Sequence, residues 1–207
     1  VIYNTEEMKT PPVGFNDFWN PANKGRVGLV DISYQFNYAM AAVAAGQGMS
    51  DYDPAEQKLR ELRQLEPKIY PSVEALAAGL KSGEVWLGSM FMARGVMWQR
   101  AGIPVKAVFP EEGTISVAFH GLVAANSGNG DAAMDYVNHL LDPAVQAAFA
   151  EKMGYNPTVD DATLPEELAA MISITEEQQQ KIVKVDHDYV ARNLQRLVSF
   201  WDREMKG

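Results

Sequence analysis

The chain has 207 residues, 47% of them hydrophobic and 22% charged, and a formal net charge of −9 at pH 7. This composition is that of a globular protein with a core, and the acidic balance argues against binding to nucleic acid or anionic membrane surfaces. The absence of cysteine excludes disulfides, thiolate catalysis and zinc–thiolate sites. The sequence contains no apolar run near the ~18 residues that a transmembrane helix needs.

Strand and helix signals alternate through the first half of the chain. Strands are predicted at residues 1–3, 25–31, 69–70, 85–90 and 105–109. The main helices are predicted at about residues 33–45, 53–66, 73–82 and 91–101, with Asp53 and Ser72 as N-caps of the second and third. Because strands alternate with helices of about 10–15 residues, the pattern predicts an α/β fold with a largely parallel sheet flanked by helices.

The fold of the chain is expected to be organised around one segment, Phe109 to Asn126. Pro110 and Gly113 predict a turn. The residues from Ile115 to Ala125 then predict a long buried strand, since they are too apolar for an exposed edge. A strand of this kind, followed by a helix, would carry the chain from one lobe to another, and we expect the ligand site beside that crossing.

The second half of the chain is predicted to be helical. Two helices follow from Asp131 and Pro143, with apolar residues expected to face inward at Tyr136, Val137, Leu140, Leu141, Val145, Phe149 and Met153. A last helix from about Asp186 is expected to bury the regularly spaced residues Val190, Leu194, Leu197 and Trp201.

The sequence offers little support for catalysis. It has no P-loop, no nucleophile elbow and no His-Glu-x-x-His motif. Its three histidines, His120, His139 and His187, are widely spaced. We therefore predict no catalytic residue, no metal site and no cofactor.

Aromatic residues at strand–helix junctions suggest binding instead. Ligands of α/β proteins bind at the carboxyl ends of strands. Of the aromatic residues near such ends, Phe36 and Trp98 are expected in the core. Candidates for ligand contact are Tyr34, Phe91, Phe119 and Tyr155.

Several segments in the same order resemble periplasmic solute-binding proteins of ABC transporters, and among them the spermidine/putrescine-binding family. The segments are FNDFWNPANKGRVGLVD at 15–31, FPEEG at 109–113, GLVAAN at 121–126, LLDPAV at 140–145 and GYNPT at 154–158. Each motif is weak alone, whereas the ordered set spans nearly the whole chain.

The resemblance implies a type 2 binding-protein fold of two α/β lobes joined by a hinge, with a small-molecule ligand between them and an ABC permease as partner. Residues 1–117 and 184–207 would form the second lobe. Residues 118–165 would form the hinge strand and part of an incomplete first lobe, and 166–183 a surface connector. About one hundred residues of the family fold have no counterpart here, so we expect pairing with a second copy or with a complementing N-terminal fragment.

The chain departs from polyamine binders at the positions that would hold ammonium groups. By resemblance, the family's two acidic positions fall near Ile32 and Gln35, its tryptophan at Phe91, and its Trp-x-Asp at Val117 and Phe119. The tyrosine of the GY motif is kept as Tyr155. Arg94 enters the same region near a helix N-terminus, which favours anions. The predicted ligand-binding residues are Tyr34, Gln35, Phe91, Arg94, Val117, Phe119, His120 and Tyr155.

These observations predict a periplasmic solute-binding component of an ABC importer that captures a small, partly apolar ligand with at least one anionic or strongly polar group and binds no polyamine tightly. No signal peptide precedes Val1, and we expect that upstream sequence has been removed. Two alternatives stay open: an enzyme on the same two-lobe fold, for which His120, His187 and Asp186 would supply acid–base groups, and a regulatory effector-binding domain.

Overall fold

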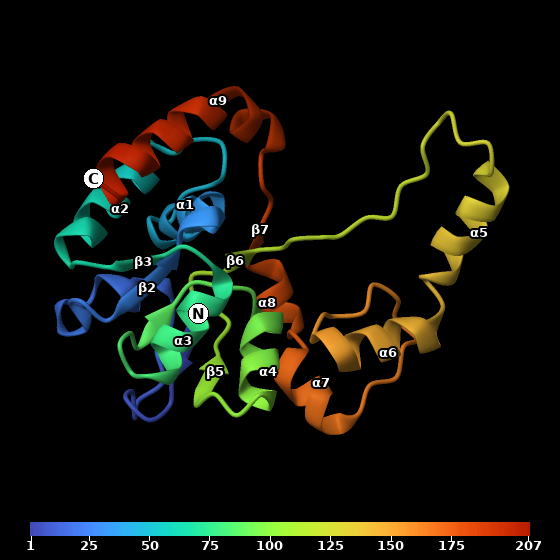
Figure 1. Cartoon of the computed structure of the whole chain (residues 1–207), viewed down its shortest axis with the longest axis horizontal. Helices are drawn as coiled ribbons and strands as arrows, with labels where there is room; N and C mark the ends of the chain where they lie inside the picture. Colours follow the sequence, from blue (N-terminus) through green and yellow to red (C-terminus); the bar gives the residue numbers. More distant parts are fainter. The chain divides into compact units, whose positions relative to one another are not determined.

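The computed structural model describes all residues, 1–207, and divides them into two compact units. Unit 1 contains Val1–Ser116 and Thr175–Gly207, and unit 2 contains Val117–Ile174. Each unit has its own secondary structure, shown along the chain in Figure 1.

Unit 1 is built on a five-stranded sheet in the order β3-β2-β4-β1-β5. The strands are β1 (Ile2–Asn4), β2 (Val27–Val30), β3 (Lys68–Tyr70), β4 (Leu87–Gly88) and β5 (Val105–Ala107). Strand β2 is parallel to β3 and β4, whereas β1 runs antiparallel to both of its neighbours, β4 and β5. Four strands therefore point one way and only β1 opposes them, which confirms the prediction of a largely parallel sheet.

Helices cover both faces of this sheet. The helices of unit 1 are α1 (Tyr34–Ala44), α2 (Asp53–Gln64), α3 (Val73–Lys81), α4 (Met92–Arg100), α8 (Glu176–Gln180) and α9 (His187–Phe200). Shorter turns are η1 (Phe15–Trp19), η2 (Pro21–Asn23), η3 (Asp31–Ser33) and the π-helical η4 (Trp201–Met205). A separate two-stranded pair joins β6 (Thr114–Ile115) to β7 (Ile182–Val183) in parallel.

Because side chains alternate between the two faces of a strand, the buried residues form two clusters, one on each face of the sheet. Val27 and Leu29 of β2 belong to the cluster that contains buried residues of α1, α2 and α9, whereas Val30 belongs to the cluster that contains residues of α3 and α4. Residues two apart in a strand share a face, so a strand buried on both faces is apolar throughout. Unit 1 is thus a three-layer α/β/α arrangement.

The chain returns to the sheet through α9, as its spacing predicts. Asp186 caps this helix by accepting a hydrogen bond from Tyr189 N at 2.8 Å. Leu197 and Trp201 are buried. The expected burial of Leu194 is wrong, because its side chain is 42% exposed.

Of the two predicted N-cap residues, one is confirmed and the other is wrong. Ser72 caps α3 as predicted, accepting from Ala75 N at 3.1 Å. The N-cap of α2 is Tyr52 rather than Asp53. Asp53 instead lies in the first turn of α2 and forms an ion pair with Arg196 of α9. A long-range partner has replaced the local cap.

The predicted long buried strand from Ile115 to Ala125 is wrong. Only Thr114 and Ile115 form a strand, and residues 116–125 lack regular structure. Phe119 and Leu122 are 72% and 89% exposed. An apolar strand needs a hydrogen-bonding neighbour and a covering layer, and no strand in the structure pairs with these residues. The predicted hinge strand is therefore an exposed, irregular segment in this chain.

Unit 2 also contains α5 (Gly130–His139), α6 (Pro143–Met153) and α7 (Glu166–Ile172). The predicted inward faces of α5 and α6 are only partly covered, with Val137, Leu140, Val145 and Met153 half-buried. No residue of α5 is buried, and Tyr136, Leu141 and Phe149 are 65%, 50% and 53% exposed. The helical periods of these segments were predicted correctly, but an amphipathic face is buried only where a neighbour covers it.

Candidate functional site

The candidate site lies where the chain leaves two neighbouring parallel strands. Strands β2 and β4 pair in register, with Gly28 opposite Gly88, so their carboxyl ends lie at the same edge of the sheet. After β2 the chain passes through η3 into α1, which begins at Tyr34. After β4 it passes through Ser89 and Met90 into α4. Such an edge is where α/β proteins place ligands.

Two phenylalanines join the starts of α1 and α4. The rings of Phe36 and Phe91 lie 4.9 Å apart, centroid to centroid, at an interplanar angle of 76°. Both side chains are only partly buried, so the expected core position of Phe36 is wrong, whereas Trp98 is buried as expected. The edge-to-face pair leaves an apolar surface at the edge of the sheet.

Neutral hydrogen-bonding groups adjoin this pair. Gln35 Nε2 donates to the Tyr34 hydroxyl at 3.2 Å, so the structure brings these two predicted residues together. Gln35 is exposed and Tyr34 is half-buried. An amide and a phenol offer both donors and acceptors without a formal charge.

The start of α4 carries an uncompensated positive charge. Phe91 is the N-cap of this helix, and no side chain accepts a hydrogen bond from the first turn. Arg94 lies in that turn, is half-buried, and forms no ion pair in the structure. Free backbone N–H groups, the helix dipole and a guanidinium all favour an anion.

Two buried polar residues at the same strand ends were missed by the sequence interpretation. Asn37, fully buried in α1, donates from Nδ2 to the carbonyl oxygen of Val30 at 3.1 Å. Its Oδ1 atom is buried and has no hydrogen-bond partner. Ser89, directly after β4, is also buried. A lone asparagine within the apolar run of α1 was the only signal for it in the sequence.

The one carboxylate next to β2 is already engaged. Asp31 accepts a hydrogen bond from Trp201 Nε1 at 2.8 Å and pairs with Lys206 Nζ at 3.1 Å. Both partners come from the C-terminal segment of unit 1. Asp31 therefore holds η4 against the end of β2, and it shares the positive charge of Lys206 with Asp202.

Unit 2 brings together two of the four predicted residues that it contains. The rings of Phe119 and Tyr155 lie 5.5 Å apart at 83°, and Tyr155 also stacks on Phe149 at 5.8 Å. Tyr155 follows Gly154, whose φ of +71° ends α6 in the left-handed conformation. Val117 and His120 lie beside Phe119 in the irregular segment and are exposed.

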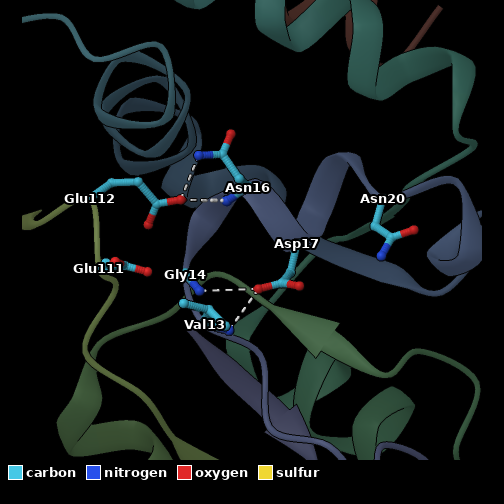
Figure 2. Close-up of a pocket in the computed structure, with 7 residues that line it drawn as sticks. All are labelled: Val13, Gly14, Asn16, Asp17, Asn20, Glu111 and Glu112. Carbon is cyan, nitrogen blue, oxygen red and sulfur yellow. Dashed lines mark hydrogen bonds between the residues drawn. The ribbon is translucent and has the colours of Figure 1, made fainter.

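A separate hollow of about 480 Å³ in unit 1 lies between η1 and the turn at 110–113, and Figure 2 shows its lining. The Glu112 carboxylate accepts hydrogen bonds from Phe15 N at 3.0 Å and from Asn16 N at 2.8 Å. Asp17 Oδ2 accepts from Val13 N at 2.7 Å and Gly14 N at 3.1 Å. Burial alone would raise the pKa of Glu112, but the hydrogen bonds from Asn16 and Phe15 lower it overall. Both carboxylates thus stabilise the backbone of residues 13–16 by accepting its hydrogen bonds.

Two further features of the chain bear on function. No group of three or more His, Cys, Asp or Glu side chains is placed so that it could hold a metal ion. None of the helices combines the length and the apolar character needed to cross a membrane.

Known proteins resemble the chain in sequence and in fold. The family model described as bacterial extracellular solute-binding protein matches residues 1–175. The spermidine/putrescine-binding periplasmic protein of Escherichia coli (strain K12) is 30% identical over 146 residues, which are 67% of this chain and 40% of that protein. The matched part of this chain therefore spans less than half the length of that relative.

Solved structures show the same fold. An ABC transporter protein from Clostridium perfringens ATCC 13124 superposes with a TM-score of 0.79 and 21% identity, covering 99% of this chain and 66% of that one. The binding protein AgtB from A. tumefaciens R10, solved in complex with agropinic acid, has a TM-score of 0.69 and 17% identity, covering 100% of this chain and 66% of that one. Because the family model matches residues 1–175, most of the chain, the chain belongs to the bacterial extracellular solute-binding protein family.

Proposed function

We propose that the chain is the ligand-binding part of a solute-binding component of an ABC importer, and that its solute is small, polar and carries an anionic group. The observation that carries this proposal is the unpaired guanidinium of Arg94 in the uncapped first turn of α4. The sheet edge at which it lies is the usual ligand position of an α/β fold.

The charge of this edge favours an anion over a polyamine. The carboxylate of Asp31 is already engaged by the Trp201 indole N–H and by Lys206, a lysine that it shares with Asp202. Ile32, next to it, is apolar and 70% exposed. A desolvated ammonium without a carboxylate partner costs several kcal/mol, roughly. We therefore propose that this protein differs in ligand from the spermidine/putrescine-binding relative.

The remainder of the edge suits a solute with a short apolar part. Phe36 and Phe91 offer ring surface, whereas Tyr34 and Gln35 offer neutral hydrogen bonds. An amino acid or a short carboxylic acid combines these features. The structural neighbour AgtB was likewise solved in complex with an acid, agropinic acid.

From unit 2 we propose the aromatic pair Phe119 and Tyr155 as ligand contacts, with Val117 and His120 beside them. The pair is already formed by packing, so little side-chain entropy remains to be lost on binding. His120 is exposed and would add a hydrogen-bond donor.

The proposal extends to location and partners. The family and the periplasmic relative favour action outside the cytoplasmic membrane, with delivery of the solute to an ABC permease. Residues 1–117 with 184–207 are proposed as the second lobe, and residues 118–165 as the hinge and part of the first lobe, with 166–183 as the connector. A second copy or an N-terminal fragment is proposed to complete that lobe.

A thermal-shift screen of the intact protein tests the proposed ligand class, since a ligand that binds the native state raises its melting temperature. Carboxylates and phosphonates are expected to stabilise the protein, and the shift is expected to disappear in Arg94→Ala but not in Lys106→Ala, where an exposed lysine on β5 is removed. Stabilisation by spermidine, putrescine or neutral sugars alone would show that the ligand class is wrong.

A further inference from the structure

A second hollow of unit 1 lies away from the sheet edge and has a different chemistry. It has a volume of about 610 Å³ and runs between α2 and the α9–η4 segment. Its lining is almost entirely polar: Glu56, Arg60, Arg192, Gln195, Arg196, Ser199, Phe200, Arg203 and Glu204. Four arginines face two glutamates there, although the chain as a whole carries a net charge of −9. We call this hollow the arginine groove.

Its two central arginines are held in place by acidic side chains. Arg196 Nε donates to Glu56 Oε1 at 2.9 Å, and Arg196 also pairs with Asp53. Arg60 lies 3.9 Å from Glu56 and 3.7 Å from Glu204, and its guanidinium lies 4.8 Å from the centre of the Phe200 ring. These contacts give the middle of the groove a fixed, nearly neutral floor.

The two outer arginines have no such partner. Arg203 Nε donates to the backbone oxygen of Ser199 at 3.1 Å, and Arg203 forms no ion pair. Arg192 forms no ion pair either and is linked to Asp186 only by longer-range attraction. Both side chains are exposed. Two guanidiniums thus remain free to bind carboxylates or phosphates in the paired geometry that they favour.

The spacing of these outer arginines selects the partner. Arg192, Arg196, Ser199 and Arg203 recur every three or four residues and so form one stripe along α9 and η4. Eleven residues separate Arg192 from Arg203, which is about 16 Å at 1.5 Å per helical residue. A small anion reaches only one of them. An extended peptide rises about 3.3 Å per residue and its side chains alternate between two faces. Acidic side chains about six positions apart therefore share one face and lie roughly 20 Å apart, close enough for the long side chains of both arginines to reach them.

We propose that the arginine groove docks an extended acidic segment of a partner protein, with one carboxylate on Arg192 and another on Arg203. The aromatic and neutral floor between them would contact the intervening residues. Arg192 and Arg203 lie outside the proposed solute site, although η4, which carries Arg203, is also held to the end of β2 by the contact between Trp201 and Asp31.

Fluorescence anisotropy with labelled peptides tests the proposal on the intact protein. The first peptide is Ser/Pro-rich and carries two glutamates six positions apart, so that both lie on one face of the extended chain. The second carries the same two glutamates side by side, and the third carries glutamines in their place. The spaced peptide is expected to bind at least threefold more tightly than the adjacent one and to weaken as ionic strength rises.

Substitutions assign the binding to the two outer arginines. Arg192→Gln and Arg203→Gln are each expected to weaken the spaced peptide roughly three- to fivefold, as exposed ion pairs do, and about tenfold together. Lys106→Gln, which removes an exposed positive charge on β5, is expected to have no effect. Unchanged melting temperatures would show that the variants are folded.

Three results would each overturn the proposal. They are equal affinity for the spaced and adjacent peptides, a loss in Lys106→Gln as large as that in Arg192→Gln, and no saturable binding of the spaced peptide. Complete displacement of the peptide by millimolar inorganic phosphate would instead assign the groove to small anions, which also contradicts a peptide-docking role.

Discussion

Phe36 and Phe91 meet edge to face, with ring centroids 4.9 Å apart, and this contact joins the segments that follow two adjacent parallel strands. Phe36 lies in α1 and Phe91 caps α4, so one aromatic contact fixes the starts of two helices that cover opposite faces of the sheet. The arrangement of the candidate ligand site therefore depends on packing as well as on hydrogen bonds.

A double-mutant cycle on this pair measures that dependence. Phe36→Leu and Phe91→Leu keep apolar volume but remove the ring–ring geometry. We expect a coupling free energy of unfolding of about 0.5–1.5 kcal/mol, the usual value for an aromatic pair. Urea unfolding of the single and double variants gives the measurement. A coupling indistinguishable from zero would mean that the rings are independent neighbours.

Asp31 is predicted to stabilise the return of the C-terminal segment. Asp31→Asn weakens the pair with Lys206 and the acceptor for Trp201, and we expect it to lower the free energy of unfolding by about 1–2 kcal/mol. Asp202→Asn is the matched control, since Asp202 pairs with the same lysine at 3.0 Å but is more exposed. Equal losses in the two variants would contradict a special role for Asp31.

Glu112 gives a prediction for the dependence of stability on pH. Burial opposes its ionisation, but hydrogen bonds from Asn16 and Phe15 lower the pKa of its folded state below the usual value. Its contribution is therefore present above the pKa of the unfolded state, about 4.3, and is lost as pH falls through the lower folded pKa. We expect Glu112→Gln to cost about 1 kcal/mol at pH 7, and this cost to shrink below about pH 4.

The neighbouring Glu111 supplies the control for that experiment. Glu111 lies in the same turn but is exposed, and the structure gives its side chain no hydrogen bond to η1. At each pH from 7 to 4, the free energy of unfolding of Glu111→Gln is expected to be almost the same as that of the wild type. A pH profile of Glu112→Gln parallel to that of the wild type would show that the carboxylate does not act through its charge.

The exposed apolar residues of unit 2 predict association with a covering surface. Phe119 and Leu122 are 72% and 89% exposed, and patches of this kind are bound by other molecules. We expect the chain to bind the dye ANS and to associate with rising concentration, and Phe119→Ser with Leu122→Ser to reduce both. Val13→Ser, at a residue of unit 1 that is 61% exposed, is the control. Dye binding unchanged in the double variant would contradict this prediction.

The fold of unit 1 could be predicted from the sequence because its signals are local. Buried strands with apolar runs, a serine cap at Ser72 and a regular stripe in α9 each specify their own element. The antiparallel insertion of β1 between β4 and β5 was not predicted, since pairing partners distant in sequence leave no local mark.

Unit 2 shows where the same reasoning fails. The apolar run from Ile115 to Ala125 has the composition of a buried strand, yet the chain provides no neighbouring strand for it. At the candidate site, aromatic residues near strand ends identified Phe91 and Tyr34. Asn37 was missed, because its importance rests on a buried oxygen without a partner, which only the packed structure shows.

The central proposal is that Arg94 binds an anionic group of the solute. Isothermal titration calorimetry with three compounds that differ in the charge of their ends tests it directly. Succinate, 4-aminobutyrate and putrescine share a four-carbon skeleton and differ in whether their ends are carboxylates or ammonium groups. We expect succinate or 4-aminobutyrate to bind at least tenfold more tightly than putrescine, which is about 1.4 kcal/mol, and Arg94→Gln to abolish that difference while Lys106→Gln preserves it. Tighter binding of putrescine, or a carboxylate preference that survives in Arg94→Gln, would contradict the account.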